Sequence, residues 1–228
     1  QNIENQKRKL LRYMDRSRRT NNPDNYNEDG TIKRGIKLEW NYSNKYIKAK
    51  NHLKDLYRKQ ADIRKQDHNI MANEIISQGD TIKVETMNFK GLQARSKNTT
   101  INDKTGKFNK KKRFGKSLAN KAPSMFLTIL KNKIESKGGL YIEVNTYKVK
   151  ASQYNHLNKE YNKKKLSQRW NHFEYNNEKI KVQRDIYSAY LIKNVDGLEV
   201  INNDKCIEGF EEFLKYHNKE ISRLQGLN

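Results

Sequence analysis

Apolar residues recur at helical spacing over the first third of the chain. Between residues 3 and 19 they form one stripe, which predicts a basic amphipathic helix. Over residues 43–77 they repeat every seven positions, which predicts a helix about 50 Å long. Turn-forming residues fill positions 20–42. We therefore expect the two helices to fold back on each other as an antiparallel hairpin, with a heptad seam made of Tyr46, Ala49, Leu53, Leu56, Ile63 and Ile70.

The period changes to two after the second helix. Ile82, Val84 and their neighbours alternate with polar residues, which predicts a strand on which Glu85 faces away from Val84. Further along, the pattern predicts a helix, a second strand, an apolar helix and an amphipathic helix, over residues 123–138, 140–149, 184–195 and 207–224. Alternating helices and strands indicate an α/β protein. Two strands make a poor sheet, so we expect further strands to be missing.

The chain has a large positive charge. It contains 48 Lys and Arg against 26 Asp and Glu, a net charge of +22. Such an excess indicates a polyanionic partner, most of all nucleic acid, with a basic membrane-surface protein as the alternative. No apolar run approaches the roughly 20 residues that span a bilayer. We therefore expect no membrane partner. The single Cys206 cannot form an internal disulfide, which suits a reducing interior, so we expect a cytoplasmic location.

Two segments, residues 7–19 and 107–116, concentrate the basic residues. The second lies in a stretch, residues 90–116, that predicts a mobile basic loop. Phe108 and Phe114 interleave with its charges, where they could stack on bases. Lys and Arg bind phosphates without reading sequence. The residues expected to contact nucleic acid are Lys7, Arg8, Arg12, Arg16, Arg18, Arg19, Lys107, Lys110, Lys111, Lys112, Arg113, Lys116 and, beside an acidic motif, Arg184.

Two acidic residues occupy positions suited to metal chemistry. Glu85 lies within a predicted strand, and Asp185 opens the apolar helix. Two-metal sites for phosphodiester cleavage are built from carboxylates so placed, because hard oxygen ligands hold Mg²⁺. Most of the 26 acidic residues must simply be solvated, so the alternative is that these two are surface residues as well.

The segment Ile82-Lys83-Val84-Glu85-Thr86-Met87-Asn88-Phe89-Lys90-Gly91-Leu92 resembles the strand that carries the second acidic residue of TnpB proteins. These are the OrfB-type proteins of insertion sequences, related to type V CRISPR effectors. Arg184-Asp185, followed by a helix rich in small residues, is similar to the family's third acidic motif. The basic hairpin, the Lys-rich loop and residues 116–124 follow in the family's order, so the resemblance covers most of residues 3–195.

The resemblance implies a RuvC-like nuclease of RNase H fold that works with a guide RNA and cuts DNA with Mg²⁺. Glu85 and Asp185 would be two of its three catalytic metal ligands. The family's first Asp lies on a strand that should precede the hairpin, and a chain without it should be inactive alone. We therefore expect a partial RNase H-like (RuvC) α/β fold that lacks its first strands and has a long basic helical hairpin and a C-terminal helix.

The family usually inserts a four-cysteine zinc finger before the third acidic motif. Here residues 150–182 contain no cysteine, and His156 and His172 stand alone. Structural zinc needs Cys or His ligands at tight spacing, so we predict no zinc. The segment is expected to be a finger-like insertion that contacts nucleic acid through Tyr154, Trp170 and Phe173. The alternative is that these three aromatic side chains only pack the interior of the insertion.

The expected organisation has four parts: a basic hairpin, a RuvC-like core that includes the basic loop, the insertion, and C-terminal helices, over residues 1–78, 79–149, 150–182 and 183–228. The expected function is a transposon-encoded part of an RNA-guided DNA endonuclease, with DNA and guide RNA as partners. The alternatives are a nuclease-inert DNA- or RNA-binding transposon relic and a basic structural protein such as a ribosomal component. Exposed sheet edges should favour self-association.

Overall fold

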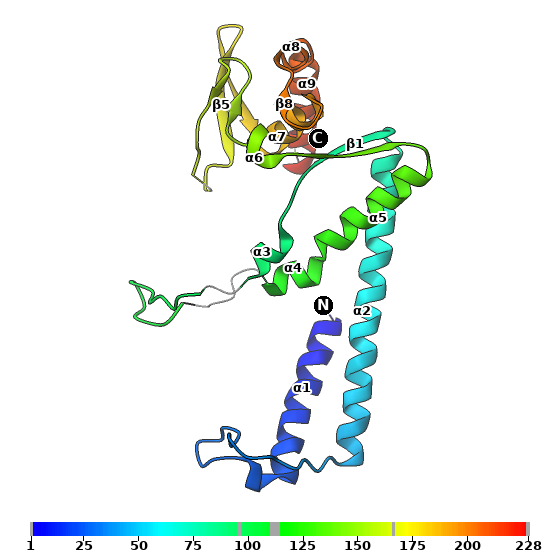
Figure 1. The fold of residues 1–228 in the computed structure, drawn as a ribbon, viewed down its shortest axis with the longest axis vertical. Helices are drawn as coiled ribbons and strands as arrows, with labels where there is room; N and C mark the ends of the chain where they lie inside the picture. Colours follow the sequence, from blue (N-terminus) through cyan, green and yellow to red (C-terminus); the bar gives the residue numbers. More distant parts are fainter. Residues whose placement is uncertain (1, 95–96, 110–114, 166, 227–228) are drawn as a thin grey trace. The chain divides into compact units, whose positions relative to one another are not determined.

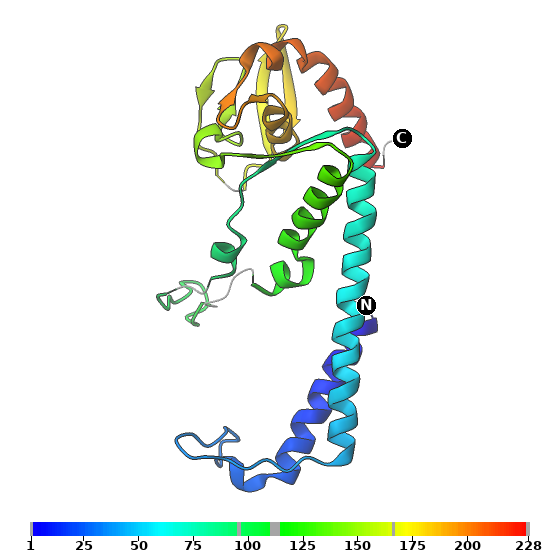
Figure 2. The same cartoon turned by 45° about the vertical axis from the view of Figure 1, so that its right-hand side comes forward.

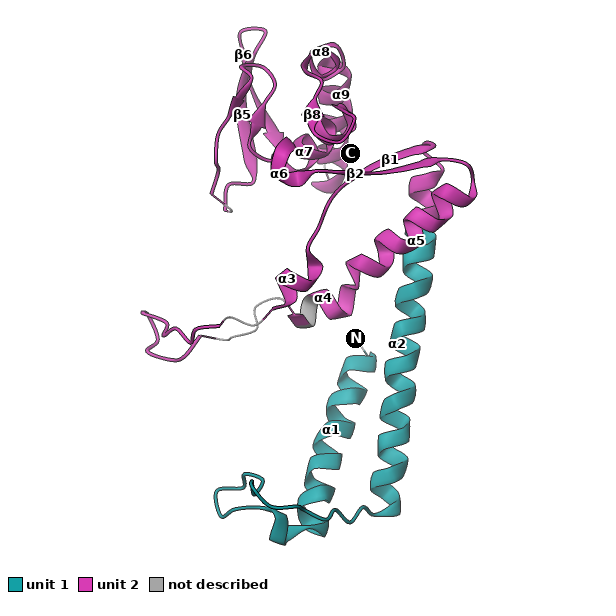
Figure 3. Ribbon diagram, viewed as in Figure 1, with its two compact units in different colours: residues 1–71 teal, residues 72–228 magenta. Residues whose placement is uncertain are grey.

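The structure is a computed structural model that describes residues 2–94, 97–109, 115–165 and 167–226 (Figure 1). It is mixed α/β, as predicted. The chain divides into two compact units, residues 1–71 and 72–228 (Figure 3). The division falls within one long helix, a few residues before the expected boundary at residue 78.

The first unit is the predicted antiparallel hairpin. Helix α1 (Asn2–Asn21) runs beside the first half of helix α2 (Asn44–Ile76), and a short 3₁₀ helix, η1 (Pro23–Asn25), lies in the loop between them. Ser17 Oγ lies 3.3 Å from Ser43 Oγ near the loop. At the other end Lys7 Nζ donates to Gln60 Oε1 over 2.7 Å. These pairings fix the antiparallel register.

The heptad seam of α2 is buried only in part. Tyr46, Ala49, Leu53 and Leu56 are buried, whereas Ile63 is 43 % and Ile70 51 % exposed. The reason is length, because α1 has 20 residues and α2 has 33. The expectation of a continuous seam is therefore corrected, because among the described residues of this unit no second helix extends far enough to cover the second half of the seam.

The second unit is built around one parallel strand pair. Strand β1 (Thr81–Glu85) pairs with β2 (Leu140–Val144) from Thr81 opposite Leu140 to Glu85 opposite Val144. One face packs against α5 (Pro123–Ser136) and the last turn of α2. The other face contributes Val144 to a larger core with helix α7 (Arg184–Lys193). Burial on both faces is what a parallel pair requires, and Figures 1 and 2 show helices on both sides.

The segment between β1 and α5 is not a simple loop. It begins with helix α3 (Phe89–Gln93) and ends with helix α4 (Gly115–Lys121), and an isolated bridge pairs Ile101 with Phe108. Strand β2 is likewise shorter than predicted. Helix α6 (Thr146–Val149) follows it at once, because the Asn145 side chain caps the first backbone N–H groups of that helix.

The insertion, residues 150–182, contains two antiparallel hairpins. Strand β3 (Tyr154–Asn155) pairs with β4 (Glu160–Tyr161), and β5 (Trp170–Tyr175) pairs with β6 (Glu178–Gln183). The chain ends with a short pair, β7 (Val195–Asp196) and β8 (Val200–Ile201), and helices α8 (Asn203–Glu208) and α9 (Phe210–Leu224).

The final helix is thus divided at Gly209, where one amphipathic helix was predicted over residues 207–224. All strands of the described residues lie in two-stranded sheets. Over the same ranges, no helix is both long and apolar enough to cross a bilayer.

Candidate nucleic-acid interface and acidic residues

The exposed face of α1 carries a stripe of arginines. Arg8, Arg12 and Arg16 follow one another at intervals of four residues, and all three side chains are exposed. This spacing places them on one side of the helix, about 6 Å apart along its axis. Like charges four residues apart destabilise a helix. No acidic partner is recorded for the three among the described residues, so the stripe is a surface that a polyanion would stabilise.

The structure corrects the prediction that Lys7 contacts nucleic acid, because this residue is buried. Only 6 % of the residue is exposed. Its ammonium lies between Glu4 and Gln60 and stands 4.4 Å above the centre of the Tyr57 ring. One residue along an α-helix turns the side chain by about 100°, which carries it from the arginine stripe to the face packed against α2. Lys7 therefore stabilises the hairpin and is unavailable to a phosphate.

Arg18 and Arg19 also have structural partners. Both bond the carboxylate of Asp15, at 3.1 and 3.0 Å, and the pKa of Asp15 is lowered chiefly by the hydrogen bond from Arg19. Arg18 lies over the Trp40 ring, and Arg19 donates to the carbonyl of Gly30 over 2.8 Å. These two arginines hold the loop between the helices, so they add less to the free basic surface than predicted.

The basic loop is described only in part. Lys107 is exposed, and its neighbour Phe108 is 74 % exposed, in the turn closed by the bridge to Ile101. An exposed ring beside a cation suits stacking on a base. The remaining predicted residues of this loop lie outside the described side chains: Lys110, Lys111, Lys112, Arg113, Phe114 and Lys116.

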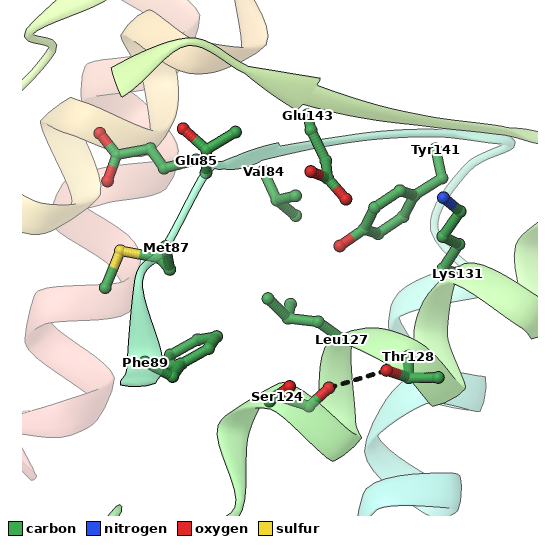
Figure 4. Close-up of a pocket in the computed structure, with 11 residues that line it drawn as sticks. Val84, Glu85, Met87, Phe89, Ser124, Leu127, Thr128, Lys131, Tyr141 and Glu143 are labelled. Carbon is green, nitrogen blue, oxygen red and sulfur yellow. Dashed lines mark hydrogen bonds between the residues drawn. The ribbon is translucent and has the colours of Figure 1, made fainter. Parts of the chain in front are cut away.

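Glu85 ends strand β1 and lies opposite Val144 in the register, on the face that the larger core covers. Val84 and Glu143 therefore share the other face, and Figure 4 shows the carboxylates of Glu85 and Glu143 directed apart, at the rim of a pocket of about 200 Å³. Burial raises the pKa of Glu85. No hydrogen bond or ion pair to its carboxylate is recorded from any described residue. A half-buried carboxylate without a cation is unusual in so basic a chain.

Asp185 lies in the first turn of α7, where the helix dipole favours a negative charge. Its side chain is 60 % exposed and bonds Arg184 at 3.2 Å and Arg169 at 3.8 Å. Arg184 is 11 % exposed and also donates to the carbonyl of Gln168 over 3.1 Å. Arg184 thus acts within the fold as a partner of the acidic residue, and its access to a phosphate is limited.

The two acidic residues come from elements in contact, because α7 packs against β1. Within the described ranges, no group of three or more His, Cys, Asp or Glu could hold a metal ion. Glu85 has the right chemistry for one Mg²⁺ ligand, but the described donor set does not complete a site, and we derive no catalytic step through a metal.

The insertion aromatics mainly pack the fold. Tyr154 and Phe173 are 7 % and 8 % exposed and belong to the larger core, while Trp170 is half-buried with the Lys181 ammonium over its ring. His156 is fully buried beside Tyr187. The packing alternative therefore describes Tyr154 and Phe173 better than nucleic-acid contact does.

No protein-family model matches this chain, and no curated protein is similar to it in sequence. The resemblance to TnpB proteins consequently rests on the quoted motifs and their order, and it stays a prediction.

Some residues of interest escaped the sequence analysis. Lys83 lies two residues before Glu85 on the same face of strand β1. Its ammonium donates to the backbone carbonyls of Lys193 and Val195. Lys164 and Asn171 bond each other within a polar pocket of the insertion. Their residue types gave no signal in a chain so rich in Lys and Asn.

Proposed function

We propose that this protein binds nucleic acid through the basic hairpin, as part of a TnpB-like, RNA-guided system with DNA and RNA partners. The observation that carries the proposal is the stripe of Arg8, Arg12 and Arg16, three exposed arginines on one helix face without recorded acidic partners. Their spacing along the helix is close to the separation of successive phosphates, about 6 Å. A polyanion laid along α1 would relieve the repulsion between them.

The distribution of roles among the basic residues supports this proposal. Lys7, Arg18 and Arg19 hold the hairpin and its loop, whereas the side chains of the three stripe arginines make no recorded ion pair with any described residue. A merely solvated basic face would carry acids among its bases, as α9 does with Glu211, Glu212 and Glu220.

The test is equilibrium binding of a fluorescent single-stranded oligonucleotide. Replacing Arg8, Arg12 and Arg16 together by Gln should weaken binding on the order of tenfold or more at moderate salt, because three phosphate contacts are lost. The matched control replaces Lys137, Lys215 and Lys219, three exposed lysines elsewhere, by Gln. If the control weakens binding as much as the stripe variant, net charge rather than the stripe is responsible.

A second function, nuclease activity, is favoured by Glu85 alone. Its half-buried carboxyl group lies at the end of a parallel strand, where burial raises its pKa, and perturbed carboxyl groups of this kind are typical of functional sites. In this proposal Glu85 and Asp185 supply two ligands of a RuvC-like magnesium site. Asp185 would exchange its contacts with Arg169 and Arg184, and a third carboxylate would come from an additional acidic strand.

Cleavage of labelled DNA with Mg²⁺ tests this second proposal. The chain alone should not cut, since the described donor set is incomplete. A polypeptide that adds an acidic strand should cut, and Glu85→Gln or Asp185→Asn should each abolish the cut while nucleic-acid affinity is retained. If both variants cut as well as the unchanged protein, the assignment of Glu85 and Asp185 is wrong.

A further inference from the structure

The insertion contains a polar pocket that the functions above do not use. It has a volume of about 190 Å³, too small for a drug-sized ligand but suited to one planar ring. Side-chain amides dominate its lining, which consists of Gln153, Asn155, Asn162, Lys164, Gln168, Asn171, His172 and Phe173. All of these residues belong to the second unit.

Asn171, which lines the pocket, has an unpaired hydrogen-bond donor. The residue is 2 % exposed, and its Oδ1 accepts from Lys164 Nζ over 2.6 Å. Because an ammonium only donates, this bond fixes the amide with Nδ2 on the other side. Nδ2 is buried and has no partner among the described residues. A buried donor left unpaired is costly, so a ligand that brings an acceptor to Nδ2 would be stabilised.

The lining favours a base over a phosphate. A phosphate only accepts hydrogen bonds and is normally held by several cations, whereas this lining has one ammonium, Lys164, and its pKa is lowered by burial and by nearby Arg184. Amides both donate and accept, which is how proteins read the edge of an unstacked base. Phe173 and His172 also line the pocket.

We propose that this pocket receives a single unpaired nucleobase, with Asn171 donating to an acceptor on the edge of the base. The inference rests on the proposed nucleic-acid binding and adds a base-dependent contact to it. It also gives the insertion a role in binding that does not require exposed aromatics, since Phe173 would contribute from the pocket wall while it packs the core.

The experiment compares two single-stranded oligonucleotides of equal length and charge, one of mixed sequence and one made of abasic units. The unchanged protein should bind the mixed sequence about tenfold more tightly, the effect of one well-held base. Asn171→Ala should reduce this ratio to about twofold or less and leave the affinity for the abasic strand unchanged. The matched control is Asn158→Ala, an exposed Asn of the same segment outside the lining, which should keep the ratio.

Three results would overturn the inference. The first is equal binding of both strands by the unchanged protein, which would leave phosphate binding and the proposed function intact. The second is an Asn171→Ala variant that keeps the ratio. The third is no binding of either strand, which would refute the proposed function as well.

A crosslink on the unchanged protein covers the case in which Asn171→Ala fails to fold. A strand carrying 4-thiouracil should crosslink to peptides between residues 153 and 173. Crosslinks found exclusively elsewhere would contradict the pocket.

Discussion

At the residue scale, the basic side chains of α1 divide into buried and exposed groups according to the helix face on which they lie. Lys7 and Arg8 are neighbours in the sequence, yet one is buried against Gln60 and the other is exposed. The sequence indicated a basic amphipathic helix correctly. It could not assign Lys7 to the packed face, because Lys is rarely buried without a partner, and only the fold supplies that partner.

His156 makes a residue-scale prediction about pH. Its ring is buried among Tyr187, Tyr190 and Phe210, with Nδ1 2.6 Å from the Tyr187 hydroxyl. Burial lowers the pKa of His156 from 6.5 to about 4. The unfolded chain therefore binds a proton at higher pH than the folded chain does. Stability should be complete above pH 6.5 and fall by about 3 kcal/mol as the pH approaches 4.

Chemical denaturation between pH 4.5 and 7.5 measures this effect. His156→Gln should flatten the dependence of the free energy of unfolding on pH over this range. His52→Gln, at an exposed position on α2, should leave it unchanged. An unaltered pH dependence in His156→Gln would show that the histidine is not charged on unfolding in this range.

At the element scale, the periodic segments were predicted well and the aperiodic ones were not. The helices α1, α2, α5 and α7 and the strand β1 lie where the pattern placed them. The four strands of the insertion were missed because their polar residues hide the alternation, and a hairpin such as β5–β6 places buried Asn171 beside buried Phe173. The length of α1 determines how much of the α2 seam is buried, and the sequence of α2 alone cannot predict that length.

Lys83 makes an element-scale prediction. Its ammonium donates to the last carbonyl of α7, over 3.0 Å, and to that of Val195, and so ties β1 to the negative end of that helix. Lys83→Met keeps the aliphatic stem and removes these bonds. We expect a loss of about 1 kcal/mol of unfolding free energy, while the exposed control Lys137→Met should change little. Equal effects of the two substitutions in thermal denaturation would contradict this role.

At the scale of the whole molecule, the net charge of +22 predicts a polyanionic partner without indicating where it would bind. The arginine stripe of α1 is the surface that we propose for it. The RNase H-like fold remains a proposal, because the described strands form a single parallel pair and three antiparallel pairs. Glu85 and Asp185 lie on elements that contact each other, β1 and α7. The Asp185 carboxylate, however, pairs with Arg169 and Arg184, and the spacing of the motifs could not predict these ion pairs.

The salt dependence of binding tests the central claim most directly. The logarithm of the association constant for a single-stranded oligonucleotide should fall linearly with the logarithm of salt concentration, with a slope of about −0.7 for each phosphate neutralised. Replacing Arg8, Arg12 and Arg16 by Gln should make that slope shallower by about 2. A slope that is the same in both proteins, or no binding by the unchanged chain, would contradict the account.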